Sequence, residues 1–301
     1  MAMTLRTNSD PWGRRVLAYG LWGQSNADGT NCRWTREFGA SPQHNLRSDG
    51  AVPGAFILDK NTQMLRLSID RPSAFRALTP GYTSAEGQYA PWLNKDNIYF
   101  GMELSFADTL LKALPRGQYT VVIVKLGVGG TTIANSNEFN WSVDSKPQYS
   151  LLEPYLHGYL SLASTLLDGY TKDWRWAGMI SMIGESDARY KDRADAWQKN
   201  MGRIIDKVRS HVGVANLPWW ITASPRYTEN GDLDPDATAL GYIETVIEQQ
   251  LGMSTVRKNV TAQNLSYPSV HADDFLHLDE LGQIRHGEQV ASWAARNILG
   301  V

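Results

Sequence analysis

The sequence lacks most of the features that would assign a protein to a class at once. It has a single cysteine, Cys32, which excludes an internal disulfide. The formal net charge is only −2, so the charge balance gives no reason to expect nucleic acid or an anionic membrane as a partner. No stretch approaches the roughly 18 uncharged apolar residues of a membrane span, and no apolar signal-peptide core follows Met1. The compartment stays open between secreted, periplasmic, phage-borne and cytoplasmic.

Motifs for metals and nucleotides are also missing. The six histidines include no His-x-x-x-His pair, and no Gly-x-x-x-x-Gly-Lys loop is present. We therefore expect neither a metal nor another cofactor. Cys32 lies seven residues after Ser25, but no base-pairing motif surrounds it, so we interpret it as a bystander thiol.

Apolar runs alternate along the chain with stretches of helical periodicity. Continuous apolar runs are typical of parallel strands that are covered on both faces. The predicted strands are Val16–Leu21, Thr120–Leu126, Met179–Ile183, Trp219–Ala223 and Val256–Leu265. The predicted helices are Glu103–Leu111, Tyr155–Leu167, Ala194–Val212, Thr238–Leu251 and Leu281–Leu299. This alternation predicts one α/β domain over residues 1–301, a three-layer α/β/α sandwich with a mainly parallel sheet.

One long segment, at about residues 31–97, does not follow this alternation. It is rich in Gly, Pro, Ser and Asn, and segments of this length without regular structure are uncommon unless they are functional or disordered. Because it directly follows the turn around Ser25, we expect it to wall a substrate cleft. The alternative is a structural flap without substrate contact. A second loop, residues 135–148, is expected to rim the same site.

Two motifs at opposite ends of the chain can together supply a nucleophile, a base and a carboxylate. Ser25 lies in a Gly-Gln-Ser-Asn turn after the first predicted strand, and Asp274 precedes His277 by three residues. A serine hydroxyl needs a neighbouring base, and a carboxylate fixes the tautomer of that base. The strand would deliver Ser25 to the carboxyl edge of the sheet, where active sites of open α/β sheets lie. Competing residues are Asp273, Asp279, His271 and His286, the last of them expected on a surface helix.

Four blocks in order resemble the SGNH (GDSL-like) hydrolases, and most closely the carbohydrate O-acetylesterases of the sialate O-acetylesterase and acetylxylan esterase type. The blocks are Gly23–Ala27, Lys125–Thr132, Gly184–Ala188 and Asp274–Leu278, the last followed by Leu281-Gly282-Gln283. The resemblance implies a flavodoxin-like SGNH fold with a Ser25, Asp274 and His277 triad. It also implies an oxyanion hole formed by the N–H of Ser25 and of either Gly129 or Gly130.

The chain departs from the family pattern just before Gly184. The family commonly has glutamine there, and this chain has Ile183, which cannot donate a hydrogen bond. Ser186, Asn26 or a bound water is then expected to serve as the third oxyanion donor. The residues expected to contact substrate or to support the catalytic groups are Gln24, Asn26, Glu185 and Ser186, with Asp187 joining Glu185 in bracing the nucleophile loop.

The resemblance implies a serine esterase that removes O-acetyl groups from carbohydrate. The expected partner is therefore an acetylated carbohydrate substrate. Acetylated sialic acid, xylan and other glycans remain open as substrates; basic candidates for a sialate carboxylate are Arg33, Arg36 and Arg226. Trp34, Trp92 and Trp141 are interpreted as core residues, with sugar platforms as the alternative. Two other functions stay open: a short-chain lipase or thioesterase, and a catalytically weak or silent carbohydrate-binding protein on the same fold. The sequence does not indicate an oligomeric state.

Overall fold

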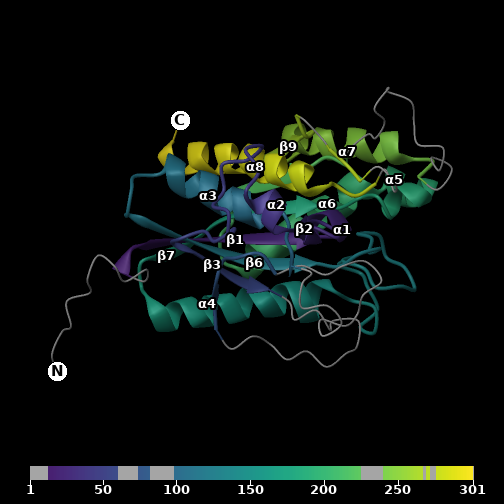
Figure 1. The fold of residues 1–301 in the computed structure, drawn as a ribbon. Helices are drawn as coiled ribbons and strands as arrows, with labels where there is room; N and C mark the ends of the chain where they lie inside the picture. Colours follow the sequence, from purple (N-terminus) through teal and green to yellow (C-terminus); the bar gives the residue numbers. More distant parts are fainter. Residues whose placement is uncertain are drawn as a thin grey trace.

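The fold is built around a seven-stranded sheet with the strand order β4-β3-β6-β1-β7-β8-β9. The computed structural model describes residues 13–59, 74–81, 98–224, 240–266, 269–271 and 276–300. Neighbouring strands run parallel, except that β3 and β4 are antiparallel. Helices lie on both faces of the sheet (Figure 1), so the predicted three-layer α/β/α sandwich is confirmed.

The long strands at the centre of the sheet are buried on both faces. In β1, Leu17, Tyr19 and Leu21 enter one core cluster, while Ala18 and Trp22 enter the other. This explains why the sequence shows continuous rather than alternating apolarity. The strands of the sheet are β1 (Arg15–Gly23), β3 (Ala55–Asp59), β4 (Arg76–Ala77), β6 (Tyr119–Gly127), β7 (Trp174–Met182), β8 (Trp219–Thr222) and β9 (Val260–Gln263). A separate antiparallel ribbon pairs β2 (Arg33–Trp34) with β5 (Ile98–Tyr99).

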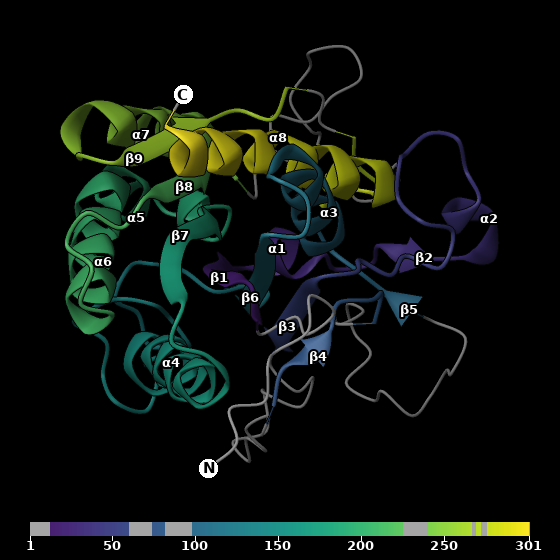
Figure 2. The same cartoon turned by 90° about the vertical axis from the view of Figure 1, so that its left-hand side faces the viewer.

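The two faces are covered by different helix pairs. Helices α3 (Glu103–Ala113) and α8 (Glu280–Leu299) pack on one face, and α4 (Gly158–Tyr170) and α6 (Trp197–His211) on the other (Figures 1 and 2). Helix α7 (Ile243–Val256) connects β8 with β9 and contacts α6. Shorter helices are α1 (Ser25–Asp28), α2 (Arg36–Gly39), α5 (Lys191–Asp195), the π-helical turn η2 (Leu152–His157) and the 3₁₀ turn η3 (Asp187–Arg189). None of the helices described combines the length and apolarity needed to cross a membrane.

Strand β3 was not predicted. It lies inside the segment 31–97, yet it pairs in parallel with β6 as part of the main sheet. Its apolar run is only four residues long, between Gly54 and Asp59, and the loop-like composition around it hid the pattern. Residues 60–73 and 82–97 lie outside the described residues, so a cleft wall formed by this segment stays a prediction.

Two of the three tryptophans in polar sequence belong to the core, as interpreted. Trp141 is fully buried, lies edge-to-face with Trp22 at 5.2 Å between ring centroids, and donates its indole N–H to Thr131 Oγ1 at 2.8 Å. Trp34 is 7% exposed. Trp92 lies outside the described residues.

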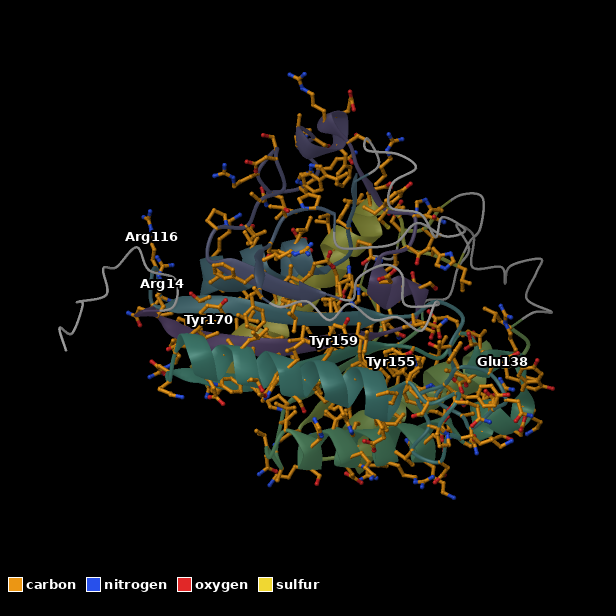
Figure 3. All side chains as sticks on the ribbon, turned by 90° about the horizontal axis from the view of Figure 1, so that it is seen from below. Arg14, Arg116, Glu138, Tyr155, Tyr159 and Tyr170 are labelled. Atoms are coloured by element: carbon orange, nitrogen blue, oxygen red, sulfur yellow. The ribbon has the colours of Figure 1, made fainter. Side chains whose placement is uncertain are left out.

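Figure 3, which views the face of the sheet that α4 covers, shows where the amino and carboxyl ends of the strands lie. Arg14 and Arg116 lie at the amino ends of the strands. Glu138, in the loop after β6, lies at the opposite end of the molecule. The loop 135–148 is therefore at the carboxyl edge, where the sequence analysis expected the site.

Candidate active site

Strand register brings the predicted site residues to one edge of the sheet. Gly23 at the end of β1 lies opposite Gly127 of β6 and opposite Met182 of β7. Ser25 follows two residues after the end of β1, and Gly129 follows two residues after the end of β6. The Gly-Glu-Ser-Asp block begins at Gly184, two residues after the end of β7. The three motifs therefore converge because three parallel strands end at the same level.

Ser25 and His277 form a hydrogen-bonded pair at this edge. Nε2 of His277 lies 2.8 Å from Oγ of Ser25. Each residue is 5% exposed, so the pair is largely shielded while still reached by solvent. With a neutral imidazole, the hydroxyl donates to Nε2, which is the geometry that general-base activation of a serine requires. Asp274 and its competitor Asp273 lie outside the described residues, so the carboxylate of the triad stays a prediction.

Two of the competing residues have structural contacts. Asp279 caps α8, because its Oδ1 accepts from the N–H of Gly282 at 2.7 Å. Its other oxygen accepts from the hydroxyl of Ser269 at 2.5 Å. His271 lies 3.9 Å from the sulfur of Cys32, measured from Nε2. Both oxygens of Asp279 are therefore committed to the loop and helix around it.

The expectation for His286 was wrong. This residue lies on α8 but is fully buried, with Nε2 2.6 Å from the hydroxyl of Thr222. Burial lowers the pKa of His286 to about 3, so the ring is neutral at physiological pH. The face of α8 that carries His286 packs toward Thr222 of β8. Because α8 has mixed polarity, its sequence does not indicate which of its polar residues face the sheet.

The residues predicted to form the oxyanion hole lie just beyond the ends of β1 and β6. Within the described residues, the N–H groups of Ser25, Gly129 and Gly130 have no hydrogen-bond partner. A Cβ atom at Gly129 would lie 3.8 Å from the Cβ of Ser25, whereas one at Gly130 would meet nothing within 4 Å. Gly130 has φ +72°, which allows the turn that follows. The N–H of Val128 donates to the carbonyl of Gly23 at 3.0 Å and ties this loop to the nucleophile strand.

Asp187 holds the glycine loop rather than the nucleophile turn. Its carboxylate accepts from the hydroxyl of Thr132 and from the N–H groups of Ile133 and Ala134, each of the latter at 3.1 Å. The side chain is fully buried. Burial raises the pKa of Asp187 to about 6, although the three donors act in the opposite direction. The prediction that Asp187 braces the nucleophile loop was therefore wrong, because its carboxylate holds the loop after β6 instead.

The raised pKa of Asp187 predicts a pH-dependent stability. The native state holds this proton more tightly than the unfolded chain, so the stabilisation is complete below pH 4 and is lost as pH rises through about 6. We expect the free energy of unfolding of the wild type, relative to Asp187→Asn, to fall by on the order of 2–3 kcal/mol over that window. Urea unfolding at several pH values measures this difference. A rise with pH would mean that the three hydrogen bonds outweigh burial.

Asn26 connects the nucleophile turn to two other segments. Its Nδ2 donates to Oε1 of Glu185 and to the carbonyl of Leu276, both at 3.0 Å. Its Oδ1 accepts from the N–H of Leu278 at 2.9 Å. Both amide hydrogens are therefore used, which argues against Asn26 as the third oxyanion donor. The neighbouring Gln24 accepts from the N–H of Gly184 at 3.2 Å.

Ile183 and Ser186 differ in what they offer the site. The side chain of Ile183 is fully buried in the core cluster on the α4 and α6 face. Ser186 is 7% exposed, and its hydroxyl has no hydrogen-bond partner within the described residues. Of the two side chains predicted as third oxyanion donor, Asn26 and Ser186, only Ser186 still has a free donor hydrogen.

Replacing Ser186 tests that role. We expect Ser186→Ala to lower kcat by about tenfold or more with little change in KM, because the donor would act only in the transition state. We expect Ile183→Gln to restore nothing and to lower stability, because an amide without a prepared partner is costly in a core. Steady-state kinetics and urea unfolding of both variants measure these effects. An unchanged kcat in Ser186→Ala would leave two backbone N–H groups as the whole oxyanion hole.

A buried ion pair supports β6 behind the site. Nζ of Lys125 lies 2.9 Å from Oε2 of Glu103, and both side chains are almost completely inaccessible. The other oxygen of Glu103 accepts from the N–H of Gly101 at 2.8 Å. Lys125, in the block that resembles the family's oxyanion segment, therefore stabilises the fold through its ion pair with Glu103.

Removing one partner of this pair should be costly. We expect Lys125→Met to lower the free energy of unfolding by about 3–5 kcal/mol, because the carboxylate of Glu103 would be left buried without compensation. Lys191→Met is the matched control, because the Lys191–Asp195 pair is exposed and screened by solvent, so its loss should change the free energy of unfolding little. Equal losses in the two variants would contradict the expectation.

No group of three or more His, Cys, Asp or Glu side chains that could hold a metal ion occurs in the part of the chain that the structure describes. The structure is thus an α/β fold with a serine and a histidine paired at the carboxyl edge of a mainly parallel sheet. Residues 16–296 match the family of carbohydrate esterases described as sialic acid-specific acetylesterase. The chain belongs to that family, and it is a carboxylic ester hydrolase.

Several solved structures share this fold. The NanS structure has a TM-score of 0.65 at 13% identity, over 95% of this chain and 98% of that chain. A protein from Arabidopsis thaliana has a TM-score of 0.62 at 18% identity, over 94% and 99%. A carbohydrate acetylesterase from Xanthomonas citri has a TM-score of 0.54 at 14% identity, over 95% and 57%. At these identities the likeness shows the fold. Comparison with curated proteins gives no match.

Proposed function

We propose that the protein is a serine esterase that removes O-acetyl groups from carbohydrate, with Ser25 as the nucleophile and His277 as the base. The observation that carries the proposal is the 2.8 Å separation of Ser25 Oγ and His277 Nε2 at the carboxyl edge of the sheet. The family contributes the acetyl group and the carbohydrate.

The proposed reaction proceeds through an acetyl-enzyme. Oγ of Ser25 attacks the acetyl carbonyl carbon while its proton moves to Nε2 of His277. The tetrahedral intermediate collapses, and His277 returns the proton to the departing sugar oxygen, which leaves as a hydroxyl. Water then attacks the acetyl-enzyme with His277 again as base, and acetate and free Ser25 are released. Asp274 would bond the other imidazole nitrogen and stabilise the imidazolium.

The proposed oxyanion hole uses the N–H groups of Ser25 and Gly129. We favour Gly129 over Gly130 because its backbone lies beside the nucleophile, as the 3.8 Å approach to Ser25 Cβ indicates. Each such donor is typically worth about 2.7–4 kcal/mol of transition-state stabilisation. Asp187 supports the arrangement by holding the two residues after Thr132 through their N–H groups.

For the substrate, we propose an O-acetylated sialic acid, which the family description names. Of the arginines considered for its carboxylate, Arg33 and Arg36 are exposed, and Arg226 lies outside the described residues. Arg33 also donates its backbone N–H to Glu280 at 2.9 Å, which links β2 to the start of α8. Arg33 and Arg36, at the start of the insertion, are therefore the two described candidates for binding the carboxylate.

Acetate release from a panel of acetylated sugars tests the proposal. The panel contains an O-acetylated sialic acid, acetylxylan, and the p-nitrophenyl esters of acetate and octanoate. We expect release from the sialate and fast turnover of the acetate ester over the octanoate ester. Preference for octanoate would favour the lipase or thioesterase, and sugar binding without turnover would favour the silent binding protein. Release from acetylxylan alone would replace the sialate as substrate.

A further inference from the structure

We propose that Asn26 is a positioning residue that fixes His277 against Ser25, and that Glu185 sets the orientation of the Asn26 amide. The inference rests on the proposed function, because it concerns the same serine and histidine. Both residues act through His277 rather than on the substrate.

The Asn26 side chain is bonded to both neighbours of His277. Its Nδ2 donates to the carbonyl of Leu276, and its Oδ1 accepts from the N–H of Leu278. The two distances are 3.0 Å and 2.9 Å. Because the peptide units on both sides of His277 are held by one planar group, the position and direction of its Cα–Cβ bond are held as well.

The same residue is covalently joined to the nucleophile. Asn26 follows Ser25 in the short helix α1, and its backbone carbonyl accepts from Nε2 of the buried Gln283 on α8 at 3.0 Å. Ser25 and His277 are 252 positions apart in the chain. A single side chain therefore sets the spacing of a pair that the fold would otherwise bring together only through long loops.

Glu185 favours one of the two possible orientations of the Asn26 side-chain amide. The amide of Asn26 has donors on one side and an acceptor on the other. In the observed orientation Nδ2 meets two acceptors, Glu185 Oε1 and the carbonyl of Leu276, and Oδ1 meets the N–H of Leu278. A flipped amide would place oxygen against two acceptors and two hydrogens against a donor. Asn26 and Glu185 are 1% and 2% exposed, so water cannot readily replace these bonds.

Burial raises the pKa of Glu185, and its hydrogen bond from Asn26 acts in the opposite direction. Oε1 can accept from Nδ2 whether or not the carboxyl carries a proton. The role assigned to Glu185 is therefore that of an acceptor, and it does not require the charge. Glu185→Gln keeps an acceptor oxygen and the size of the side chain but loses the charge, whereas Glu185→Ala removes the acceptor, so this pair of variants separates the charge of Glu185 from its role as an acceptor.

The test compares the reactivity of Ser25 with stability. The variants are Asn26→Ala, Asn26→Asp, Glu185→Ala and Glu185→Gln. The control is Arg209→Met: Arg209 is 8% exposed and donates to the carbonyls of Leu217 and Lys258, at the amino ends of β8 and β9. The readouts are the rate at which a fluorophosphonate probe labels Ser25, kcat and KM for p-nitrophenyl acetate, and urea unfolding.

We expect Asn26→Ala and Asn26→Asp to slow labelling and kcat by about 100-fold, the cost of misplacing a catalytic group by about 1 Å, with KM nearly unchanged. Glu185→Ala should follow them, and Glu185→Gln should stay within about threefold of the wild type because the acceptor is retained. Arg209→Met should lose stability and keep both rates.

Two results would overturn the inference: labelling of folded Asn26→Asp at nearly the wild-type rate, or an equal loss of rate in Arg209→Met. Asn26→Asp has almost the volume of asparagine, so it keeps the test valid if Asn26→Ala does not fold. Labelling of Ser25 needs no acetylated sugar. A wild type that labels at Ser25 but releases no acetate from glycans would therefore end the proposed function and leave this comparison intact.

Discussion

Ser25→Ala is expected to remove esterase activity while the fold stays intact. The hydroxyl is the only group that this substitution deletes, and it is the atom that would form the acetyl-enzyme. Removal of the nucleophile from a well-studied serine protease costs on the order of a million-fold in kcat. The residual rate of hydrolysis should be the rate that substrate binding and the oxyanion N–H groups support without a nucleophile. Rates with p-nitrophenyl acetate and far-ultraviolet circular dichroism measure the two parts of this prediction.

Ser142→Ala is a suitable control for Ser25→Ala. Ser142 is also buried, but its hydroxyl accepts from the N–H of Asp144 at 3.1 Å, so its loss tests loop stability. The fluorophosphonate probe should label the wild type at Ser25 and leave Ser25→Ala unlabelled. Retention of more than about a tenth of wild-type turnover in Ser25→Ala would place the nucleophile elsewhere.

His277→Ala should be nearly as damaging as the loss of the nucleophile. The imidazole takes the proton from Ser25 and later returns it to the sugar oxygen, so both half-reactions depend on it. In a serine triad that has been dissected, removal of either the serine or the histidine costs about the same factor, on the order of a million in kcat. Single-turnover assays should show both acetylation and deacetylation slowed.

Asp274→Asn should cost less than His277→Ala, because a carboxylate orients the base and stabilises its charged form without moving the proton to substrate. The loss should still reach about 10⁴-fold in kcat. Asp273→Asn is the neighbouring control and should cost far less. A larger loss at Asp273 would move the triad by one residue, and equal small losses would mean that another group orients His277.

The sequence predicted the parts of the fold that depend on local pattern. The apolar runs that became β1, β6 and β7 were long enough to recognise, and their register then carried Ser25 and Gly129 to the same edge. Strand β3 was missed because a four-residue run shows no periodicity of its own, and its place in the sheet comes from pairing with β6. This segment therefore forms a strand because of its tertiary contact with β6 and not because of its local sequence pattern.

The contacts that complete the site could not be predicted in the same way. The bond from Asn26 to Glu185 joins residues 159 positions apart, and nothing in either motif indicates which amide hydrogen meets which oxygen. The partner of Asp187 was assigned to the wrong loop for the same reason. Burial of His286 depends on the rotation of α8 against the sheet, which a helix with mixed polarity leaves undetermined.

Cys32 has a practical consequence for observing the active site in motion. The thiol is fully buried and donates to the carbonyl of Leu278, the residue directly after His277, at 2.9 Å. Burial also raises its pKa, so little thiolate is present in the closed state. An alkylating reagent can therefore react only when the packing around Cys32, which includes Leu278 of the histidine turn, opens. Because the chain has no second cysteine, the rate of alkylation measures how often this packing next to His277 opens, without any introduced label.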